Sequence, residues 1–395
     1  MNQKKAIKDK LFAMEADIFN AIPQHQSMSL LQGIGGLPIL YLQLYKNTRS
    51  RSYLKKMDVI FDQLIDAIQN SEPSVTFCEG IAGVSLMLNY MHKETTYNKI
   101  TVSELSGILD TIMFRFYQQH NSFYDLDFLH GSAGILVAWL SKKSSSAKVF
   151  TEVKQLMPKF IKALEIYLDN LNAEENPKKI VNCGMAHGLI SQIMILSMYT
   201  SKFGDKQYLP LIKRMVSLMT AVQYKGDNVL KSVFPSIVNL NDDSSDYQYI
   251  VPLGWCYGDT TASIGLAKAG EVLEDENMIS YAYQVALRSI SRETDMQVII
   301  YDASFCHGSA SIAHSYNKWR WRTNDPAFEA AYEKWIGRTL ELCQFEDGVG
   351  GFKKFEGDKY TRETGLLDGA AGVAMVLSDY VYDQKSTWDS AFLLS

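Results

Sequence analysis

The chain has 395 residues, of which 47% are hydrophobic and 21% charged, and its 39 basic against 44 acidic residues give a formal net charge of −5. This is the composition of a globular protein, and the negative balance argues against nucleic acid as the main partner. A membrane-spanning helix needs roughly 18 apolar residues or more, whereas the most apolar stretch, 134–140, is short. We therefore expect no transmembrane segment.

The N-terminal 19 residues predict a structural helix. Ile7, Leu11, Met14 and Ile18 recur at helical spacing. The early lysines are not followed by a continuous apolar core, so the segment does not have the pattern of a signal peptide. We expect this helix to be part of the folded chain.

The cysteines indicate an intracellular protein. They are few and far apart in the sequence, namely Cys78, Cys183, Cys256, Cys306 and Cys343. Such spacing does not form a disulfide framework, and without an export signal we expect reduced thiols and a cytoplasmic location. Any chemistry of these cysteines is then metal binding or nucleophilic attack.

A glycine-led segment returns seven times along the chain, each time opening a stretch of small and apolar residues. The copies begin at Gly33, Gly80, Gly131, Gly188, Gly258, Gly308 and Gly369, at intervals of 47, 51, 57, 70, 50 and 61 residues. Such intervals accommodate one pair of helices and its connections. Seven pairs give about fourteen helices.

The two helices of each pair differ in polarity. The segment after each glycine carries few charges over its first turns, which predicts an inner helix buried on most sides. Longer amphipathic stretches lie between the copies and predict outer helices, namely 52–69, 102–119, 147–170, 206–224, 275–292 and 325–343. We therefore expect a single all-α domain over residues 1–395, a closed double-layered α/α toroid of seven inner and seven outer helices.

Two stretches interrupt this pattern and predict loops or small β-hairpins. Residues 225–253 and 344–364 mix Gly, Pro, Asp and Asn with short β-prone runs, and both lead into a glycine segment. Loops that enter the same ends of parallel inner helices gather on one rim of the barrel. We expect the functional site on that rim, just before the glycines.

The candidate metal ligands are Cys256, Cys306 and His307, which lie one or two residues before two of the glycines. The repeat aligns these positions in space, and two cysteines with one histidine suit Zn²⁺ with a fourth position open for water or substrate. The alternative is that both cysteines are small buried hydrophobic residues, as free cysteines usually are.

Other residues near the glycines have simpler interpretations. His187 and Asp127 hold positions before Gly188 and Gly131, where Asp127 is also a candidate helix N-cap. Cys183 and His130 lie close to them and are interpreted as a packing residue and a hydrogen-bonded structural histidine. We expect Cys78 and Cys343 in the core.

Together these elements resemble the LanC family of lanthionine cyclases over nearly the whole chain. The resemblance is carried by the seven glycine helices and by three motifs: Asn182 and Gly184 with His187-Gly188, then Trp255-Cys256-Tyr257-Gly258, and Cys306-His307-Gly308. It implies an α/α toroid that holds one zinc ion through Cys256, Cys306 and His307, with His187, Asp127 and Tyr257 as active-site residues. The chain departs from the family pattern at Pro252, where some members have arginine, and at Thr260-Thr261, where members often have Pro-Gly.

The implied reaction is addition of a cysteine thiol of a dehydrated, ribosomally made precursor peptide to a dehydroalanine or dehydrobutyrine of the same peptide. Zinc would deprotonate the thiol, whose pKa is ordinarily about 8.5. We expect His187 to donate the proton to the α-carbon and Asp127 to orient it. Tyr257 either hydrogen-bonds the enolate oxygen or orients the peptide.

Competing functions are kept open. Protein prenyltransferases also use zinc-bound thiolates on an α/α barrel, but they usually include an Asp ligand, and none is placed for it here. A LanC-like protein that adds glutathione or another free thiol to dehydrated peptides, and a non-catalytic peptide-binding toroid, both fit the residues. The family also implies a dehydratase partner and an exporter, and through them a location at the inner face of the membrane.

Overall fold

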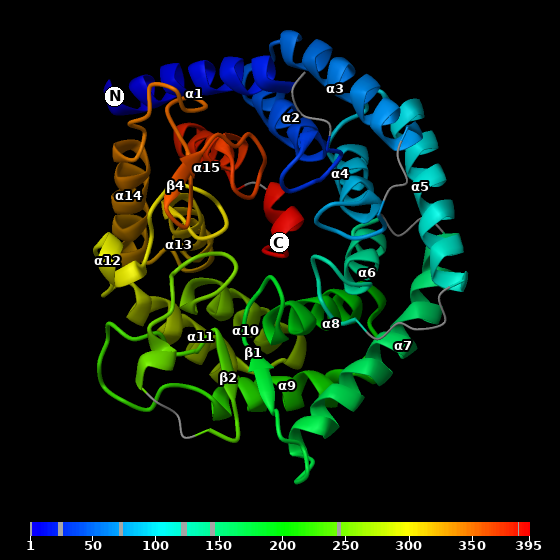
Figure 1. Ribbon diagram of the computed structural model, residues 1–395, viewed down its shortest axis with the longest axis vertical. Coiled ribbons are helices and arrows are strands. Elements are labelled where there is room, and N and C mark those ends of the chain that lie inside the picture. The colour runs from blue at the N-terminus through cyan, green and yellow to red at the C-terminus, as the bar shows by residue number, and fades with distance from the viewer. Residues whose placement is uncertain are drawn as a thin grey trace.

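The computed structural model describes residues 2–22, 27–70, 74–119, 125–142, 147–242, 246–385 and 387–395. Its helices form two concentric layers arranged in a ring (Figure 1). The fold is the predicted all-α toroid. Among the described helices, none combines the length and apolarity needed to cross a membrane.

The inner layer consists of helices that are apolar on most sides, as the sequence predicts. α6 is buried at every residue from Ala133 to Leu140, because it packs between neighbouring inner helices and the outer layer. Within the described residues, seven helices form this layer: α2 (Leu37–Thr48), α4 (Ile81–Glu94), α6 (Ala133–Leu140), α8 (Leu189–Phe203), α10 (Asp259–Leu273), α13 (Ser309–Thr323) and α15 (Ala370–Tyr382).

The outer layer consists of amphipathic helices. In α3 the buried residues Tyr53, Met57, Ile60 and Leu64 recur at helical spacing and face the inner layer. The described residues contain seven such helices: α1 (Asn2–Ala21), α3 (Ser52–Gln69), α5 (Lys99–Gln119), α7 (Ala147–Asn172), α9 (Leu209–Ala221), α11 (Glu276–Ser289) and α14 (Pro326–Glu341). These bounds agree with the predicted stretches to within a few residues.

The two ends of the helical sequence meet and close the ring. α1 packs against α15, and α15 also contacts α2 (Figure 1). The helix predicted at the N-terminus is thus the outer partner of the last inner helix. Closure, which periodicity alone leaves open, is confirmed by these contacts.

The interruptions contain short elements. In 344–364, β3 (Lys354–Glu356) and β4 (Lys359–Thr361) form the predicted hairpin. In 225–253, β2 (Ile237–Asn239) instead pairs antiparallel with β1 (Ile180–Asn182), which precedes α8. The stretch therefore contributes one strand, not a hairpin, and its residues 243–245 lie outside the described residues. The short helices are η2 (Ile34–Gly36), η3 (Asp246–Tyr249), α12 (Asp295–Val298) and η4 (Trp388–Phe392).

The repeated glycines are required where a turn passes close to the start of an inner helix. A Cβ on Gly188 would lie 2.3 Å from the carbonyl oxygen of Asn182, six residues earlier. Gly258 has a φ of +107°, which side chains rarely adopt, and a Cβ there would lie 2.4 Å from the carbonyl oxygen of Pro252. The tight turn brings the residues just before each glycine onto one rim of the inner barrel.

Candidate functional site

Backbone hydrogen bonds join consecutive turns along this rim. The amides of Trp255 and Cys256 donate to the carbonyl of Cys306 over 2.8 and 3.1 Å. The amides of Phe305 and Cys306 in turn donate to the carbonyl of Leu367, each over 2.9 Å. The turns that carry the two candidate zinc cysteines are therefore held side by side by their main chains.

Cys256, Cys306 and His307 form a compact group of soft ligands. Their two Sγ atoms and one ring nitrogen lie within 4.8 Å of one another, and within the part of the chain that the structure describes no other three His, Cys, Asp or Glu side chains meet this criterion. Hydrogen bonds from Cys306 and His307 lower the pKa of the Cys256 thiol despite burial. The same hydrogen bond with Cys256, together with burial, raises the pKa of the Cys306 thiol. Cys256 is therefore the cysteine of this group that more readily takes the thiolate form, in which cysteine binds metals.

The donor set fits zinc. Two thiolates and one imidazole are borderline-soft ligands that suit a tetrahedral zinc ion and leave its fourth position open. The turns are also packed closely enough to fix the ligands, because a Cβ on Gly254 would lie 2.7 Å from the Cα of His307 and 3.0 Å from the carbonyl oxygen of Cys306. The main chain, more than the side chains, defines this cradle.

His187 and Asp127 form a hydrogen-bonded pair on the same rim. The Nδ1 atom of His187 lies 2.6 Å from the Oδ2 atom of Asp127, and the two side chains are 35% and 23% exposed, so solvent and a substrate reach the imidazole. The hydrogen bond with Asp127 raises the pKa of His187 although partial burial opposes it. The pair keeps His187 protonated to a higher pH than a free histidine.

Asp127 also braces its own turn. Its Oδ1 atom accepts the backbone amides of Leu129 and His130, each over 2.8 Å. The helix N-cap position of α6 belongs to Ser132, so Asp127 is not that cap. One carboxylate thus holds the turn with one oxygen and His187 with the other.

The pair lies beside the metal-ligand group. The amides of Met185 and Ala186 approach the carbonyl of Cys256 at 3.0 and 3.5 Å, which fixes the His187 turn next to the Cys256 turn. His130 stacks on His187 with ring centroids 5.7 Å apart. The His130 side chain is exposed and stacks on the His187 ring. Among the residues that the structure describes, its ring has no hydrogen-bond partner, although the sequence predicts a hydrogen-bonded histidine.

Tyr257 is anchored by a residue that sequence reasoning quoted only as part of a motif. Its hydroxyl accepts a hydrogen bond from Nδ2 of Asn182 over 3.2 Å, and the Asn182 Oδ1 atom accepts the amide of Gly184 over 2.9 Å. A Cβ on Gly184 would lie 2.6 Å from the Tyr257 ring. Burial raises the pKa of Tyr257, so the phenol stays neutral and can donate its proton to an acceptor.

The remaining cysteines lie apart from the group of three. Cys183 and Cys78 are buried, and burial raises the pKa of each thiol to about 12. The Sγ atom of Cys343 donates to the carbonyl of Gly350 over 3.4 Å. Cys78 and Cys183 are buried packing residues, as the sequence predicts, whereas Cys343, expected in the core, is only partly buried.

The sequence positions of the site follow a rule that our sequence reasoning recognised only in part. The residue before each repeated glycine is polar in all seven copies, namely Gln32, Glu79, His130, His187, Tyr257, His307 and Asp368. Asp368 was missed; its Oδ2 atom lies 3.1 Å from Lys354 Nζ on β3 and accepts Gln32 Nε2 over 3.4 Å. Alignment of the repeats by their glycines is the signal that identifies this residue.

The departures from the family motifs lie under the Cys256 turn. Thr260 and Thr261 are buried, and their hydroxyls approach the carbonyl oxygen of Gly254 at 3.4 and 3.5 Å. The carbonyl of Pro252 packs against Gly258. The two threonines therefore support the turn from below and do not line the open rim.

Several solved structures are similar to this chain to different degrees. Among solved structures, "Nisin cyclase" matches with a TM-score of 0.73 and 17% identity over 100% of this chain and 98% of that one. An α-1,6-mannanase variant of Salegentibacter sp. HEL1_6 has a TM-score of 0.45 and 9% identity over 98% and 100% of the two chains. A family 105 glycoside hydrolase of C. acetobutylicum has a TM-score of 0.45 and 11% identity over 97% and 99%.

A search of curated protein sequences gave no match. Residues 24–393 match the family described as "Lanthionine synthetase C-like protein". This match covers nearly the whole chain, including every rim residue discussed above. The chain belongs to the lanthionine synthetase C-like family.

Proposed function

We propose that this protein is a zinc-dependent lanthipeptide cyclase whose single catalytic domain spans residues 1–395. The observation that carries the proposal is the meeting of two chemical groups on one rim. The soft-ligand group Cys256, Cys306 and His307 lies beside the Asp127–His187 pair, and backbone hydrogen bonds join the turns of Cys256 and His187. Membership of the lanthionine synthetase C-like family and the helical toroid support the same activity.

Cys256, Cys306 and His307 would hold the zinc ion. Bound there, zinc would lower the pKa of a peptide thiol that reaches its open position, so that the thiol is ionised at neutral pH. The Cys256 turn, which would hold the ion, is joined by backbone hydrogen bonds to the turn of His187. A peptide thiol bound there would therefore lie close to the proton donor.

The residues of the chain supply the proton. A carbon–sulfur bond forms at the β-carbon of dehydroalanine or dehydrobutyrine, and the π electrons of its double bond move toward the α-carbon and its carbonyl. Protonated His187 then donates its proton to the α-carbon, while the thiol proton has been released, so the net reaction is addition of the thiol and needs no other reactant. Asp127 orients His187 and stabilises its protonated form.

Tyr257 has two roles that fit its position. Its neutral hydroxyl, held by Asn182, is placed beside Cys256 in the chain and can donate to the enolate oxygen or orient the bound peptide. Both roles require the hydroxyl, so Tyr257→Phe would lower the cyclisation rate in either case. We propose Tyr257 as an active-site residue on this basis.

The proposed substrate is a dehydrated ribosomal precursor peptide. A dehydratase that makes the dehydro residues, and an exporter that removes the product, are the expected partners. The proposed location is the cytoplasm, or the inner face of the membrane through these partners. Addition of glutathione or another free thiol to dehydrated peptides is the second candidate, because the same residues support it when the thiol comes from a different molecule.

The decisive experiment combines zinc analysis with a ring-forming assay. Elemental mass spectrometry of the purified protein is expected to give about one zinc per chain. A synthetic peptide with one dehydroalanine and one cysteine should then lose its free thiol without a change in mass. A mass increase by one glutathione, when glutathione is added, would favour the second candidate. A zinc-loaded protein that consumes no thiol would leave only a peptide-binding toroid.

A further inference from the structure

The segment 388–394 fills the centre of the ring. Figure 1 shows the C-terminal end of the chain inside the inner layer, surrounded by helices from every part of the sequence. Trp388, Asp389, Ala391, Phe392 and Leu393 have no exposed surface. A segment so completely enclosed contributes to the barrel interior as a core element, although it lies outside the helical repeats.

Buried polar contacts fix this segment in one position. The Asp389 carboxylate lies 2.8 Å from Nε2 of His314 and 2.7 Å from Nζ of Lys318, both on α13. Trp388 Nε1 donates to Asp379 Oδ2 on α15 over 2.8 Å. Burial alone would raise the pKa of Asp389, but Lys318 and His314 reverse the effect and hold it well below its usual range. A charge buried without such partners would be strongly unfavourable.

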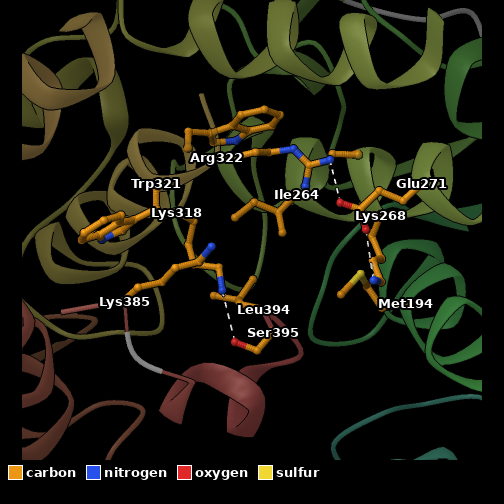
Figure 2. Close-up of a pocket in the computed structure, with 12 residues that line it drawn as sticks. Met194, Ile264, Lys268, Glu271, Lys318, Trp321, Arg322, Lys385, Leu394 and Ser395 are labelled. Atoms are coloured by element: carbon orange, nitrogen blue, oxygen red, sulfur yellow. Dashed lines mark hydrogen bonds and ion pairs between the residues drawn. The ribbon is translucent and has the colours of Figure 1, made fainter. Parts of the chain in front are cut away.

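At one end the segment reaches a cavity remote from the candidate zinc site. This cavity, of about 550 Å³, lies among the C-terminal halves of α10 and α13 (Figure 2). Lys318, Trp321 and Leu394 are among its lining residues, and Lys318 points toward the end of the segment. The last residues of the chain, Leu394 and Ser395, therefore border this cavity.

Two other residues of the segment, Trp388 and Phe392, contact the turns that carry both candidate zinc cysteines. The carbonyl of Phe392 accepts a hydrogen bond from Trp255 Nε1 over 2.8 Å, and the two rings pack edge to face with centroids 5.2 Å apart. The Phe392 ring also lies 4.3 Å from the Phe305 ring, and Trp388 packs on Phe305 at 5.2 Å. Trp255 and Phe305 directly precede Cys256 and Cys306 in the sequence.

We propose that the segment 388–392 is a positioning element, with Phe392 as its main contact, that sets the separation of Cys256 and Cys306 from inside the barrel. The inference rests on the proposed zinc site. Both aromatic residues before the cysteines are supported by the same ring, so a change in Phe392 reaches both ligands at once. Groups that orient metal ligands without touching the metal commonly change its affinity about 10–100-fold.

The test is the zinc affinity of full-length Phe392→Ala, measured by competition with a chromophoric chelator. We expect weaker binding by roughly 10–100-fold and an altered visible spectrum when Co²⁺ replaces zinc, because the cysteines move relative to each other. The matched control is Phe328→Ala, which removes an equally buried ring from α14, far from the turns. It is expected to lose comparable stability but to keep the wild-type zinc affinity and cobalt spectrum.

A milder variant is used in case Phe392→Ala does not fold. Phe392→Leu keeps an apolar side chain but loses the ring contacts, and should show a smaller change in the same direction. Unchanged affinity and spectrum in a folded Phe392 variant, or an equal change in Phe328→Ala, would overturn the inference. Wild-type protein that binds no zinc would instead overturn the proposed function and with it this inference.

Discussion

The turn of Cys256 and the turn of His187 occupy equivalent places in the repeat. They differ in how each is joined to its functional partner, Cys306 for the first and Asp127 for the second. Cys256 and Cys306 are brought together by main-chain hydrogen bonds between their turns. His187 and Asp127 are brought together by their side chains, and among the described residues no backbone hydrogen bond joins these two turns. A substitution of Cys256 or Cys306 removes a ligand but leaves the backbone hydrogen bonds between the turns in place. A substitution of His187 or Asp127 removes a functional group and also the side-chain hydrogen bond that joins the two turns.

The largest expected effect is loss of a cysteine ligand. Cys256→Ser or Cys306→Ala should reduce bound zinc to a small fraction of one per chain and lower cyclisation below detection, because two ligands hold zinc poorly. Elemental analysis and the peptide assay measure the two effects. Far-UV circular dichroism should stay as in the wild type, since the main chain holds the turns.

Cys183→Ala is the control for these variants, because Cys183 is a buried thiol near His187 that lies outside the ligand group. It should keep about one zinc per chain. Zinc loss in Cys183→Ala equal to that in Cys306→Ala would contradict the assigned ligand set.

The second expected effect is loss of the proton donor. His187→Ala should bind zinc as the wild type does and cyclise about 10²–10⁴-fold more slowly, the range typical of a lost general acid. Pre-steady-state mass spectrometry of the peptide measures the rate. His130→Ala removes the stacked neighbour and should have a much smaller effect; equal losses in both variants would remove His187 from its assigned role.

The third effect is a shift in pH dependence. Asp127 raises the pKa of His187, so the protonated donor is fully present at low pH and is lost only as the pH rises through this raised pKa. In Asp127→Asn the pKa of His187 falls, and the high-pH limb of the rate profile should move to lower pH. Rates between pH 5 and 9 test this, and an unmoved limb would contradict the role of the pair.

The smallest effect is expected far from both regions. Asp325 caps α14 by accepting the amide of Ala327 over 2.8 Å, as the Asp-Pro pair predicts. Asp325→Ala should slightly lower the free energy of unfolding in urea, because the helix loses its cap, and leave zinc content and cyclisation unchanged below the unfolding transition. Zinc loss in this variant would show that both regions depend on overall stability more than on their local contacts.

Much of the fold could be predicted because it repeats. The glycines mark the start of every inner helix, and the amphipathic stretches mark the outer ones, with 52–69 matching α3 at both ends. The pairing of β1 with β2 could not be predicted, because each strand has three residues and their partners are distant in the sequence. The place of 388–394 was also missed, since this segment has no helical period and its burial depends on helices from the whole ring.

For the candidate site, the sequence predicted the residues better than the hydrogen bonds between them. Cys256, Cys306, His307 and His187 stand out because they lie one or two residues before repeated glycines, and the structure brings the first three together. The contact of Asp127 with His187 agrees with the role expected from the family resemblance. Its second task, accepting the two turn amides of Leu129 and His130, was not predicted, since it depends on the local course of the turn. A sequence motif identifies the side chains of a site, but it does not predict which oxygen of a carboxylate bonds to which neighbour.

The amino-acid sequence by itself determined the repeat, the buried and exposed helix faces and the polar residue before each glycine, because these depend on local backbone geometry and on the period of apolar residues. The tertiary structure decided which of those positions meet. Closure of the ring joins α1 to α15, the packing of neighbouring repeats sets Asp127 against His187, and the burial of the C-terminal segment places Phe392 behind both cysteine turns. Such contacts join residues far apart along the chain, and only the packing of the complete ring selects them.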